Sequence, residues 1–295
     1  MNPVQIRPIR AIEEVLRVEE LQRQVWEITD NTEVVPVHLL VTAAENGGVL
    51  LGAFDQASGE MVGFVFSFLG RDETGQLKHC SHMLGVLPAL RNGQIGFQLK
   101  LAQRQSILQQ GIQLVTWTFD PLQSRNAYFN FHKLGGISRH YLPNLYGEMG
   151  DGLNAGLPTD RLLLEWHIAS QRVRSLLDPK EPGQGVPPTA AQDIEAFSSD
   201  PTSTRILRAR PLTNGLIHPP GLLPAFQEPT VLVQVPANFP ELKRQDLSLA
   251  QAWQNYTRGV LETSFQQGYT VLDYLRRGGE CYYKLVASTV ECYEN

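Results

Sequence analysis

The chain of 295 residues is longer than most single compact domains, so two domains are expected. Hydrophobic residues make up 42% of the chain and charged residues 19%, a balance that argues against disorder or a membrane protein. A formal net charge of -5 gives no electrostatic reason to bind nucleic acid.

The start of the sequence and the cysteines indicate a compartment. Charges interrupt the first residues where a secretory signal needs an apolar centre, and no apolar run is long enough to cross a bilayer, so we expect a cytoplasmic protein. Cys80, Cys281 and Cys292 are odd in number and lack metal-ligand spacing. Reduced thiols are therefore expected, with no metal site.

The first part of the chain alternates strand and helix signals. "VQIRPIR" predicts a strand and residues 11–28 an amphipathic helix, followed by "GVLLGAF" and "MVGFVFSF" as a hairpin around the turn "DQASGE". "HCSHMLGV" predicts the next strand, and a helix of about four turns then ends at Gly111, where glycine suits a left-handed closing residue. "IQLVTWTF" is the strand after it. Strand, loop, helix and strand together predict a βαβ unit with a parallel pair.

The second part differs in composition. The segment from about residue 172 to 200 is rich in Pro, Gly, Ser and Asp, which predicts a linker or a long surface excursion. We predict a first domain over residues 1–170, a linker over 171–200 and a smaller α/β unit over 201–295. In that unit "TVLVQVP", "YTVLDYLR" and "CYYKLVAS" are strands, and a helix carries an apolar stripe of Leu249, Ala252, Trp253, Tyr256 and Val260.

The two parts echo each other briefly. Each runs strand, proline, loop, helix ending in "QQG", strand. The second copy has "ANFPELKRQD" in place of the spaced glycines, so we do not expect it to hold a phosphate in the same way.

The loop "HMLGVLPALRNGQIGF" is the strongest chemical signal. Between a strand and a helix, Arg91, Gly93 and Gly96 can turn backbone N–H groups toward one point while the helix N-terminus adds its positive end, which favours a phosphate or pyrophosphate. The loop is neither a nucleotide P-loop nor a dinucleotide fingerprint. A tight strand-to-helix turn without a ligand explains the glycines equally well.

"VLPALRNGQIGFQLKLAQ" resembles the acetyl-coenzyme A (acetyl-CoA) signature of the GNAT superfamily of N-acetyltransferases, and "RNAYFNFHKLGG" resembles that family's later Asn-x-x-Ala and Lys-Leu-Gly segment. The resemblance covers roughly residues 4–166. The chain is also similar to a two-part subgroup with "WTFDPLQSRNA" and "LPTDRLLLEW". The resemblance implies an α/β fold with a mixed, twisted GNAT-type sheet flanked by helices, followed by a smaller half-GNAT-like unit.

The resemblance also implies an acyl-CoA-dependent N-acyltransferase that transfers acetyl from acetyl-CoA to an amine by direct attack on the thioester. The acceptor would be a small-molecule or peptide amine, with no nucleic acid or membrane partner, and a homodimer stays open. The implied coenzyme A ligands are Leu84, Gly85, Val86, Arg91, Asn92, Gly93, Gln94, Ile95, Gly96 and Asn126. Gln94 stands where the family has its middle glycine, and a side chain there crowds a close approach or a positive φ.

The proton chemistry departs from the family pattern. Phe131 stands in the place of the tyrosine that serves as general acid, so we name Tyr128, one helical turn earlier, as the substitute acid. Asp120, at the end of a strand, is the first candidate base and His82 the second, although a capping aspartate and a histidine held within the sheet are the alternatives. Two rival functions remain: an acyl-CoA-binding protein without turnover, and a scaffold that kept the fold without the ligand.

A last pair is expected to be structural. Asp160 and Arg161 stand at a strand start in "PTDRLLLEW", which favours an ion pair on a solvated rim over the alternative, contact with an anionic substrate.

Overall fold

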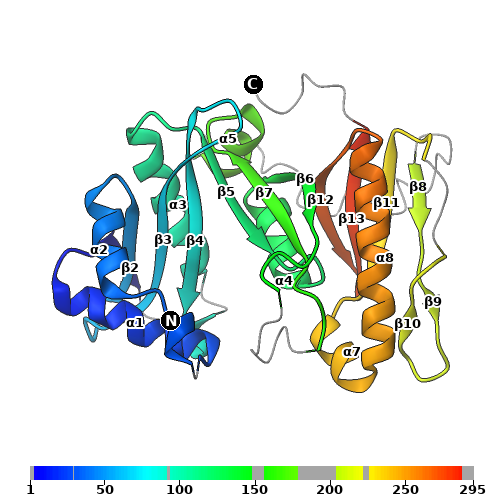
Figure 1. Cartoon of the computed structure of the whole chain (residues 1–295), viewed down its shortest axis with the longest axis horizontal. Coiled ribbons are helices and arrows are strands. Elements are labelled where there is room, and N and C mark those ends of the chain that lie inside the picture. Colours follow the sequence, from blue (N-terminus) through cyan, green and yellow to red (C-terminus); the bar gives the residue numbers. More distant parts are fainter. Residues whose placement is uncertain are drawn as a thin grey trace. The chain divides into compact units, whose positions relative to one another are not determined.

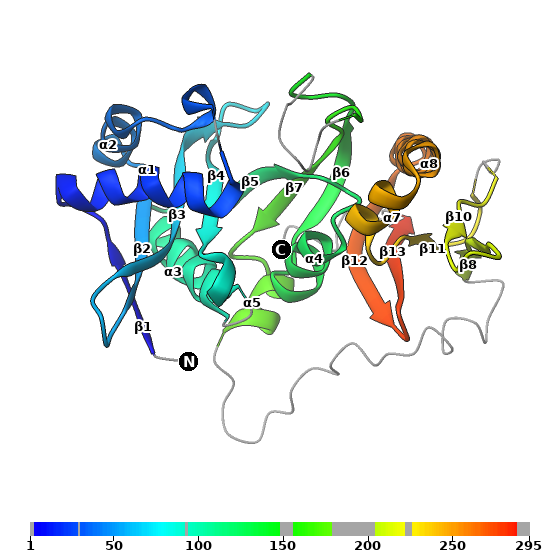
Figure 2. The same ribbon diagram turned by 90° about the horizontal axis from the view of Figure 1, so that it is seen from below.

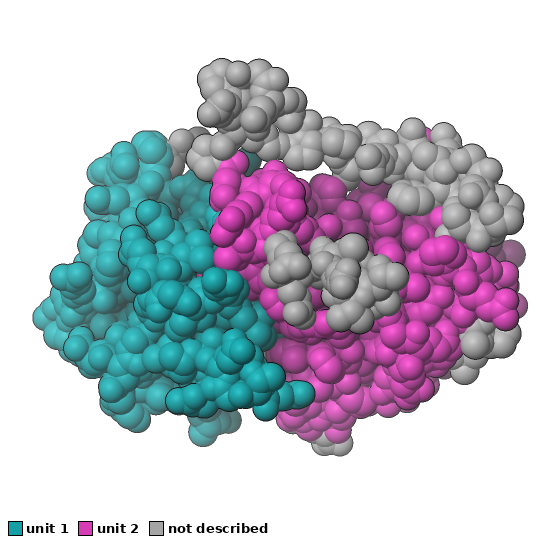
Figure 3. Space-filling view, turned by 90° about the horizontal axis from the view of Figure 1, so that it is seen from above, with its two compact units in different colours: residues 1–117 teal, residues 118–295 magenta. Residues whose placement is uncertain are grey.

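The computed structural model describes residues 3–28, 30–91, 94–147, 156–178, 204–221 and 226–287. The chain forms two compact units, residues 1–117 and 118–295 (Figure 3). Among the helices described, none is long and apolar enough to cross a membrane. Most of the predicted linker lies outside the described residues, and the division into domains at residues 171–200 stays a prediction.

The first unit holds a mixed sheet in the order β1-β2-β3-β4-β5, in which only β4 and β5 run parallel. Helices α1 and α2 contact one face and α3 contacts the other (Figure 2). The elements are β1 (Val4–Pro8), α1 (Ile12–Trp26), a 3-10 turn (Asn31–Glu33), α2 (Val37–Glu45), β2 (Val49–Asp55), β3 (Met61–Arg71), β4 (Leu77–Val86), a 3-10 turn (Pro88–Leu90), α3 (Ile95–Gln109) and β5 (Leu114–Phe119), which continues into the second unit.

Local signals account for these elements. The β2–β3 hairpin turns where Asp55 Oδ1 accepts hydrogen bonds from the N–H groups of Ala57 and Ser58, both at 2.9 Å, and Gly59 takes φ +74°. Gly111 closes α3 with φ +76°, as predicted. The hairpin, the βαβ unit and the α/β class with a mixed sheet flanked by helices are confirmed.

The second unit holds the strand order β7-β6-β12-β13-β11-β8 and a separate β10-β9 ribbon (Figure 1). Its elements are α4 (Ser124–Ala127), a π-helix (Tyr128–Lys133), β6 (Ile137–Leu142), β7 (Arg161–His167), α5 (Gln171–Leu177), β8 (Thr204–Leu207), β9 (Arg210–Pro211), β10 (Ile217–His218), β11 (Thr230–Val235), α7 (Phe239–Gln245), α8 (Leu247–Gln266), β12 (Tyr269–Arg277) and β13 (Glu280–Ala287). Four of the five residues in the predicted α8 stripe are buried: Leu249, Trp253, Tyr256 and Val260.

The echo between the two parts of the chain has a different form from the one expected. The expected alignment matched β11–α8–β12 with β4–α3–β5, whose strands are neighbours, but β13 lies between β11 and β12. In the order β7-β6-β12-β13, the antiparallel pair β6–β7 at one end corresponds to the antiparallel pair β12–β13 at the other. The two pairs meet in the middle, where β6 pairs antiparallel with β12 through Ser138 and Val271. The chain segment β11–α8–β12–β13 therefore repeats the topology of β5–α4–β6–β7.

Long-range hydrogen bonds fix the turn after β5 within the second unit. The Tyr283 hydroxyl donates to the Pro121 carbonyl at 2.5 Å, and the Ser124 hydroxyl donates to the Pro236 carbonyl at 2.8 Å. The Tyr274 hydroxyl donates to Ser124 Oγ, also at 2.8 Å. Residues that follow β5 are thus positioned by strands from the end of the chain.

Candidate functional site

The outer edge of β4 opens in the middle of the strand. β5 pairs with β4 only at His79↔Val115 and Cys80↔Thr116, and no described residue of β5 beyond Thr116 pairs with it. On its other edge β4 pairs with β3 as far as Val86, with one extra residue at His82 between the pairs Phe66↔Met83 and Ser67↔Ser81. A bulge of this kind bends a strand and increases its twist. The parallel pair therefore ends where β4 bends.

The free edge of β4 carries backbone hydrogen-bonding groups. The Leu87 N–H donates to the Val62 carbonyl of β3 at 3.0 Å, and the direction of such groups alternates along an antiparallel strand. Leu84 and Val86 consequently direct their N–H and C=O groups away from β3. A side-chain contact of 3.5 Å from Arg91 Nε to the Val86 carbonyl agrees with this direction. An extended ligand could pair with this edge as an added strand does.

The free edge leads to the N-terminus of α3. Gln94, the residue before this 15-residue helix, makes no capping hydrogen bond through its side chain, so among the described residues it leaves the first N–H groups of the helix uncapped. Gln94, directly before the helix, takes φ +59° and ψ +6°, the left-handed conformation that glycine adopts most easily. Here a glutamine adopts this conformation. Asn92 and Gly93 lie outside the described residues.

Gly96 leaves room beside the helix start. A Cβ at Gly96 would lie 3.7 Å from Leu84 Cδ2 and 3.9 Å from Val86 Cγ2, which is ordinary contact. The protein fold alone therefore does not require glycine at this position. Ile95 beside it is buried and anchors the helix start.

Arg91 has a structural role as well as a place in the loop. Its guanidinium donates from Nη2 to the Val25 carbonyl at the end of α1, at 2.6 Å. The side chain thereby ties the loop to α1. The contribution expected of Arg91 to phosphate binding thus rests on its backbone.

His82, the second candidate base, occupies the bulge. Its side chain is exposed, with its ring 6.2 Å from the ring of Phe66 and 5.9 Å from that of Phe68, and partial desolvation by these neighbours lowers its pKa. A lowered pKa keeps the imidazole neutral at neutral pH, where it can accept a proton but is a weaker base than an ordinary histidine.

Lys100 is a buried cation that sequence reasoning missed. It is only 2% exposed, and its Nζ donates to Ser81 Oγ and Gln103 Oε1, both at 2.9 Å, and lies 3.6 Å from the centre of the Trp117 ring. Burial lowers the pKa of its ammonium group well below the ordinary value. Ser81 follows the last residue of β4 that pairs with β5. The sequence signal that could have pointed to Lys100 was its spacing of four residues from Gly96, because this spacing puts Lys100 and Gly96 on one face of α3.

Asp120, the first candidate base, directly follows β5 and belongs to the second unit. Its Oδ1 accepts the Leu122 N–H at 2.8 Å and its Oδ2 accepts from Gln123 Nε2 at 3.3 Å, so it shapes the turn as a capping aspartate does. Burial nevertheless raises its pKa, and the hydrogen bond from Leu122 and the positive charge of Arg161 offset only part of that effect. The two alternatives for Asp120 are therefore compatible.

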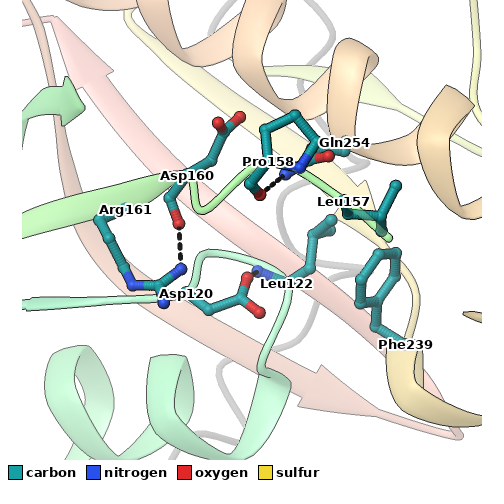
Figure 4. Close-up of a pocket in the computed structure, with 8 residues that line it drawn as sticks. All are labelled: Asp120, Leu122, Leu157, Pro158, Asp160, Arg161, Phe239 and Gln254. Atoms are coloured by element: carbon teal, nitrogen blue, oxygen red, sulfur yellow. Dashed lines mark hydrogen bonds between the residues drawn. The ribbon is translucent and has the colours of Figure 1, made fainter. Parts of the chain in front are cut away.

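A pocket in the second unit surrounds Asp120 (Figure 4). The space inside it that a water molecule can occupy is only about 10 Å³, room for about one water. The turn after β5, the start of β7, α7 and α8 each contribute to its wall. The lining residues are Asp120, Leu122, Leu157, Pro158, Asp160, Arg161, Phe239 and Gln254.

The expected rim pair of Asp160 and Arg161 is wrong. Asp160 is 2% exposed, and its carboxylate accepts from Arg258 Nη2 at 2.7 Å, Arg258 Nε at 2.9 Å and the Tyr141 hydroxyl at 2.7 Å. Arg161 instead donates from Nη1 to the backbone carbonyl of Asp160 at 2.8 Å. The salt bridge is buried because α8 supplies its cation.

The remaining candidates lie on the short helix and the π-helix after it. Asn126 is exposed on α4. Tyr128 is half-buried and stacks on His132, with ring centres 4.7 Å apart, and the Arg276 guanidinium lies 5.4 Å from its ring. Phe131 is fully buried, 5.8 Å from the ring of Phe119. Phe131 therefore serves the core, whereas the contacts given for Tyr128 are those of its ring with His132, Lys133 and Arg276.

The structure thus groups the predicted residues in two sets. His82, Leu84, Gly85, Val86, Arg91, Gln94, Ile95 and Gly96 lie on β4, the loop after it and the start of α3, in the first unit. Asp120, Asn126 and Tyr128 lie on the turn after β5, α4 and the π-helix, in the second.

No family model matches the sequence, and no curated protein matches it. Among solved structures, a Desulfovibrio desulfuricans protein assigned to the GNAT family of acetyltransferases is similar over 57% of this chain and 100% of its own, at 16% identity and a TM-score of 0.45. Aminoglycoside 6'-acetyltransferase type Ii is similar over 57% of this chain and 99% of its own, at 19% identity and a TM-score of 0.44. Naa50 from Arabidopsis thaliana, in complex with the bisubstrate analogue CoA-Ac-MVNAL, is similar over 55% and 97%, at 17% identity and a TM-score of 0.43. At these identities and TM-scores the likeness by itself assigns neither a ligand nor an activity.

Proposed function

We propose that the chain is an N-acetyltransferase that uses acetyl-CoA and an amine. The observation that carries the proposal is the continuous path in the first unit from the unpaired edge of β4 to the uncapped N-terminus of α3. An extended amide-containing arm that ends in a pyrophosphate matches both parts of that path. The acetyl-CoA thioester supplies an activated acetyl group.

The residues of the chain take stated roles in this proposal. The backbone of Leu84 and Val86 pairs with the pantetheine arm, and the N–H groups at Ile95 and Gly96 hold the pyrophosphate. A backbone donor on the free edge stabilises the oxyanion that forms when an amine attacks the thioester carbonyl carbon. Asp120 accepts the proton that the amine loses as the C–N bond forms. The C–S bond then breaks, and the leaving thiolate takes a proton, for which Tyr128 is the donor.

Coenzyme A binding tests the proposal. Amide hydrogen exchange of residues 84–87 and 95–97 should slow at saturating coenzyme A, because the ligand contacts are mostly backbone. Gly96→Val should abolish the protection by crowding the pyrophosphate, whereas Gly96→Ala should weaken it less. Gly111→Ala at the other end of α3 is the control for a glycine substitution, and it should bind coenzyme A normally if it folds.

The outcome also separates the rival functions. Absence of binding at millimolar coenzyme A rejects both the transferase and the acyl-CoA-binding protein, and leaves a scaffold. Binding without acetyl transfer identifies an acyl-CoA-binding protein without turnover, which the glutamine at position 94 and the phenylalanine at position 131 favour.

A further inference from the structure

The π-helix after α4 carries a tyrosine whose ring is held by a neighbour in the same segment. Residues 128–133 form this π-helix, a rare helix type that is frequent at functional sites. Tyr128 stacks on His132, with ring centres 4.7 Å and ring planes 23° apart. The Tyr128 hydroxyl has no hydrogen-bond partner among the described residues. The contacts of this tyrosine thus fix its ring and leave its O–H group unused by the fold.

A carboxylate from β12 holds the histidine in place. His132 Nδ1 lies 3.1 Å from Asp273 Oδ1, which also accepts the Tyr274 N–H at 2.7 Å. Burial would raise the pKa of Asp273, but the hydrogen bond and the charge of His132 outweigh it and lower that pKa, so the carboxyl group is ionised at neutral pH. Because an ionised carboxylate only accepts hydrogen bonds, His132 donates from Nδ1 and the orientation of its ring is set.

β12 is irregular at this carboxylate. In the pairing of β12 with β13, Leu272 is an extra residue directly before Asp273. A bulge of this kind re-aims a side chain and is frequent beside active sites. Three residues further along, Arg276 places its guanidinium 5.4 Å from the centre of the Tyr128 ring. One strand, 141 residues beyond His132, therefore supplies two charged groups to the surroundings of one tyrosine.

We propose that β12 completes a proton-donor site around Tyr128; the role of this site in acetyl transfer rests on the proposed N-acetyltransferase function. Asp273 and His132 are positioning residues that fix the tyrosine ring. The O–H bond of Tyr128 breaks as the S–H bond of coenzyme A forms, and water later returns a proton to the phenolate. The Arg276 guanidinium stabilises that phenolate. The C-terminal part of the chain thereby supports a donor where Phe131 cannot act.

The stacked ring gives a spectroscopic test that needs no activity. In the full-length protein with ¹³C-labelled tyrosine rings, the Tyr128 signal is identified by its loss in Tyr128→Phe. A stacked imidazole displaces this signal from the position of tyrosine in an unfolded chain. We expect His132→Ala and Asp273→Leu to move the signal toward that position. Asp273→Asn keeps an acceptor for Nδ1, and His38→Ala removes an exposed histidine on α2, so both should leave it in place.

The rate of thiol release from acetyl-CoA with a primary amine tests the role in transfer. His132→Ala should lower kcat about tenfold with an unchanged KM for acetyl-CoA, because a misplaced donor affects the transition state and not binding. Arg276→Met should lower kcat about threefold, since the guanidinium is exposed and solvent screens its charge, whereas Arg277→Met is the matched control. Tyr128→Phe should cost about a hundredfold, and adding His132→Ala to it should cost nothing more.

The outcomes separate this inference from the proposed function. A Tyr128 signal that stays in place in both His132→Ala and Asp273→Leu overturns the positioning by β12, whether or not the protein transfers acetyl. The same loss of kcat from His132→Ala with and without Tyr128→Phe overturns the donor role and leaves the transferase standing. Absence of acetyl transfer by the wild-type protein rejects the proposed function and the donor role together, while the signal still decides whether β12 holds the ring.

Discussion

Replacement of Asp120 by asparagine distinguishes two roles for this residue, a general base and a capping residue of the turn. Asparagine keeps Oδ1 as an acceptor for the Leu122 N–H, and the Gln123 side chain can turn to pair with the new amide group. Because burial raises the Asp120 pKa, the folded protein holds the ionised form less readily than the unfolded chain does. Ionised Asp120 therefore lowers stability at neutral pH, and we expect Asp120→Asn to change the free energy of unfolding by less than about 1 kcal/mol.

The rate should respond much more strongly than the stability. Loss of a general base costs about a hundredfold, or about 2.7 kcal/mol of activation free energy. The assay follows thiol release from acetyl-CoA with a primary amine as acceptor over a range of pH. The wild-type enzyme should lose activity toward acid pH at a pKa above the ordinary 3.8 of aspartate, and the variant should lack that limb and recover part of its rate at alkaline pH, where free amine is abundant.

A different pattern would refute this reasoning. If Asp120→Asn lowers stability by about 1–2 kcal/mol, as the loss of a helix or turn cap does, and turns over at the wild-type rate once folded, Asp120 is a capping residue. Coenzyme A affinity should barely change in either case. Glu262→Gln removes a carboxylate from α8 without touching the pocket and should leave rate and pH profile unchanged.

Three further predictions concern single residues. Gln94→Gly should tighten coenzyme A binding in calorimetry, and weaker binding would contradict this. The free energy of unfolding should change by less than about 1 kcal/mol, because relief of the left-handed strain is offset by the added freedom of the unfolded chain. Lys100→Met should raise the free energy of unfolding at neutral pH. Because burial lowers the lysine pKa, the unfolded chain binds more protons than the folded protein, so the stability of the wild-type protein rises with pH and the variant should lose part of this rise. Denaturant titrations at several pH values measure that slope, and an unchanged slope in the variant would contradict the prediction. Glu165→Gln should cost about 3 kcal/mol at neutral pH, because burial, which would raise the pKa, is outweighed by the hydrogen bonds from Arg139 and by His167, whose Nε2 lies 3.5 Å from Glu165 Oε2, so that the pKa is held at about 2. That stability is present above the ordinary 4.5 and is lost as pH falls toward 2, so a variant with unaltered acid unfolding would refute the assignment.

Local patterns predicted the parts of the fold that local chemistry decides. The β2–β3 hairpin follows from Asp55 and Gly59, the end of α3 from Gly111, and the buried face of α8 from its regular apolar stripe. The strained position at Gln94 could also be predicted, because its place in the motif calls for a positive φ. In each case the determining residues lie within a few positions of one another.

Long-range packing decided what the sequence could not predict. Arg258 pairs with Asp160 from 98 residues away, and Gln254 reaches the Pro158 carbonyl across 96. Neither spacing follows a helical or strand period, so the pocket they help to form was not visible in the sequence. The position of β13 between β11 and β12 in the second unit was not predicted, because a repeat of elements along the sequence does not specify which strands become neighbours.

Formation of an N-acetylated amine from acetyl-CoA tests the central claim most directly. The protein is incubated with acetyl-CoA and a panel of small-molecule and peptide primary amines, and mass spectrometry of the N-acetylated amine is compared with the release of free thiol. We predict equal amounts of the two products, a rate that saturates with both substrates, and loss of both in Gly96→Val. Thiol release without acetylated amine, or no reaction although coenzyme A protects residues 84–97, would contradict the N-acetyltransferase function.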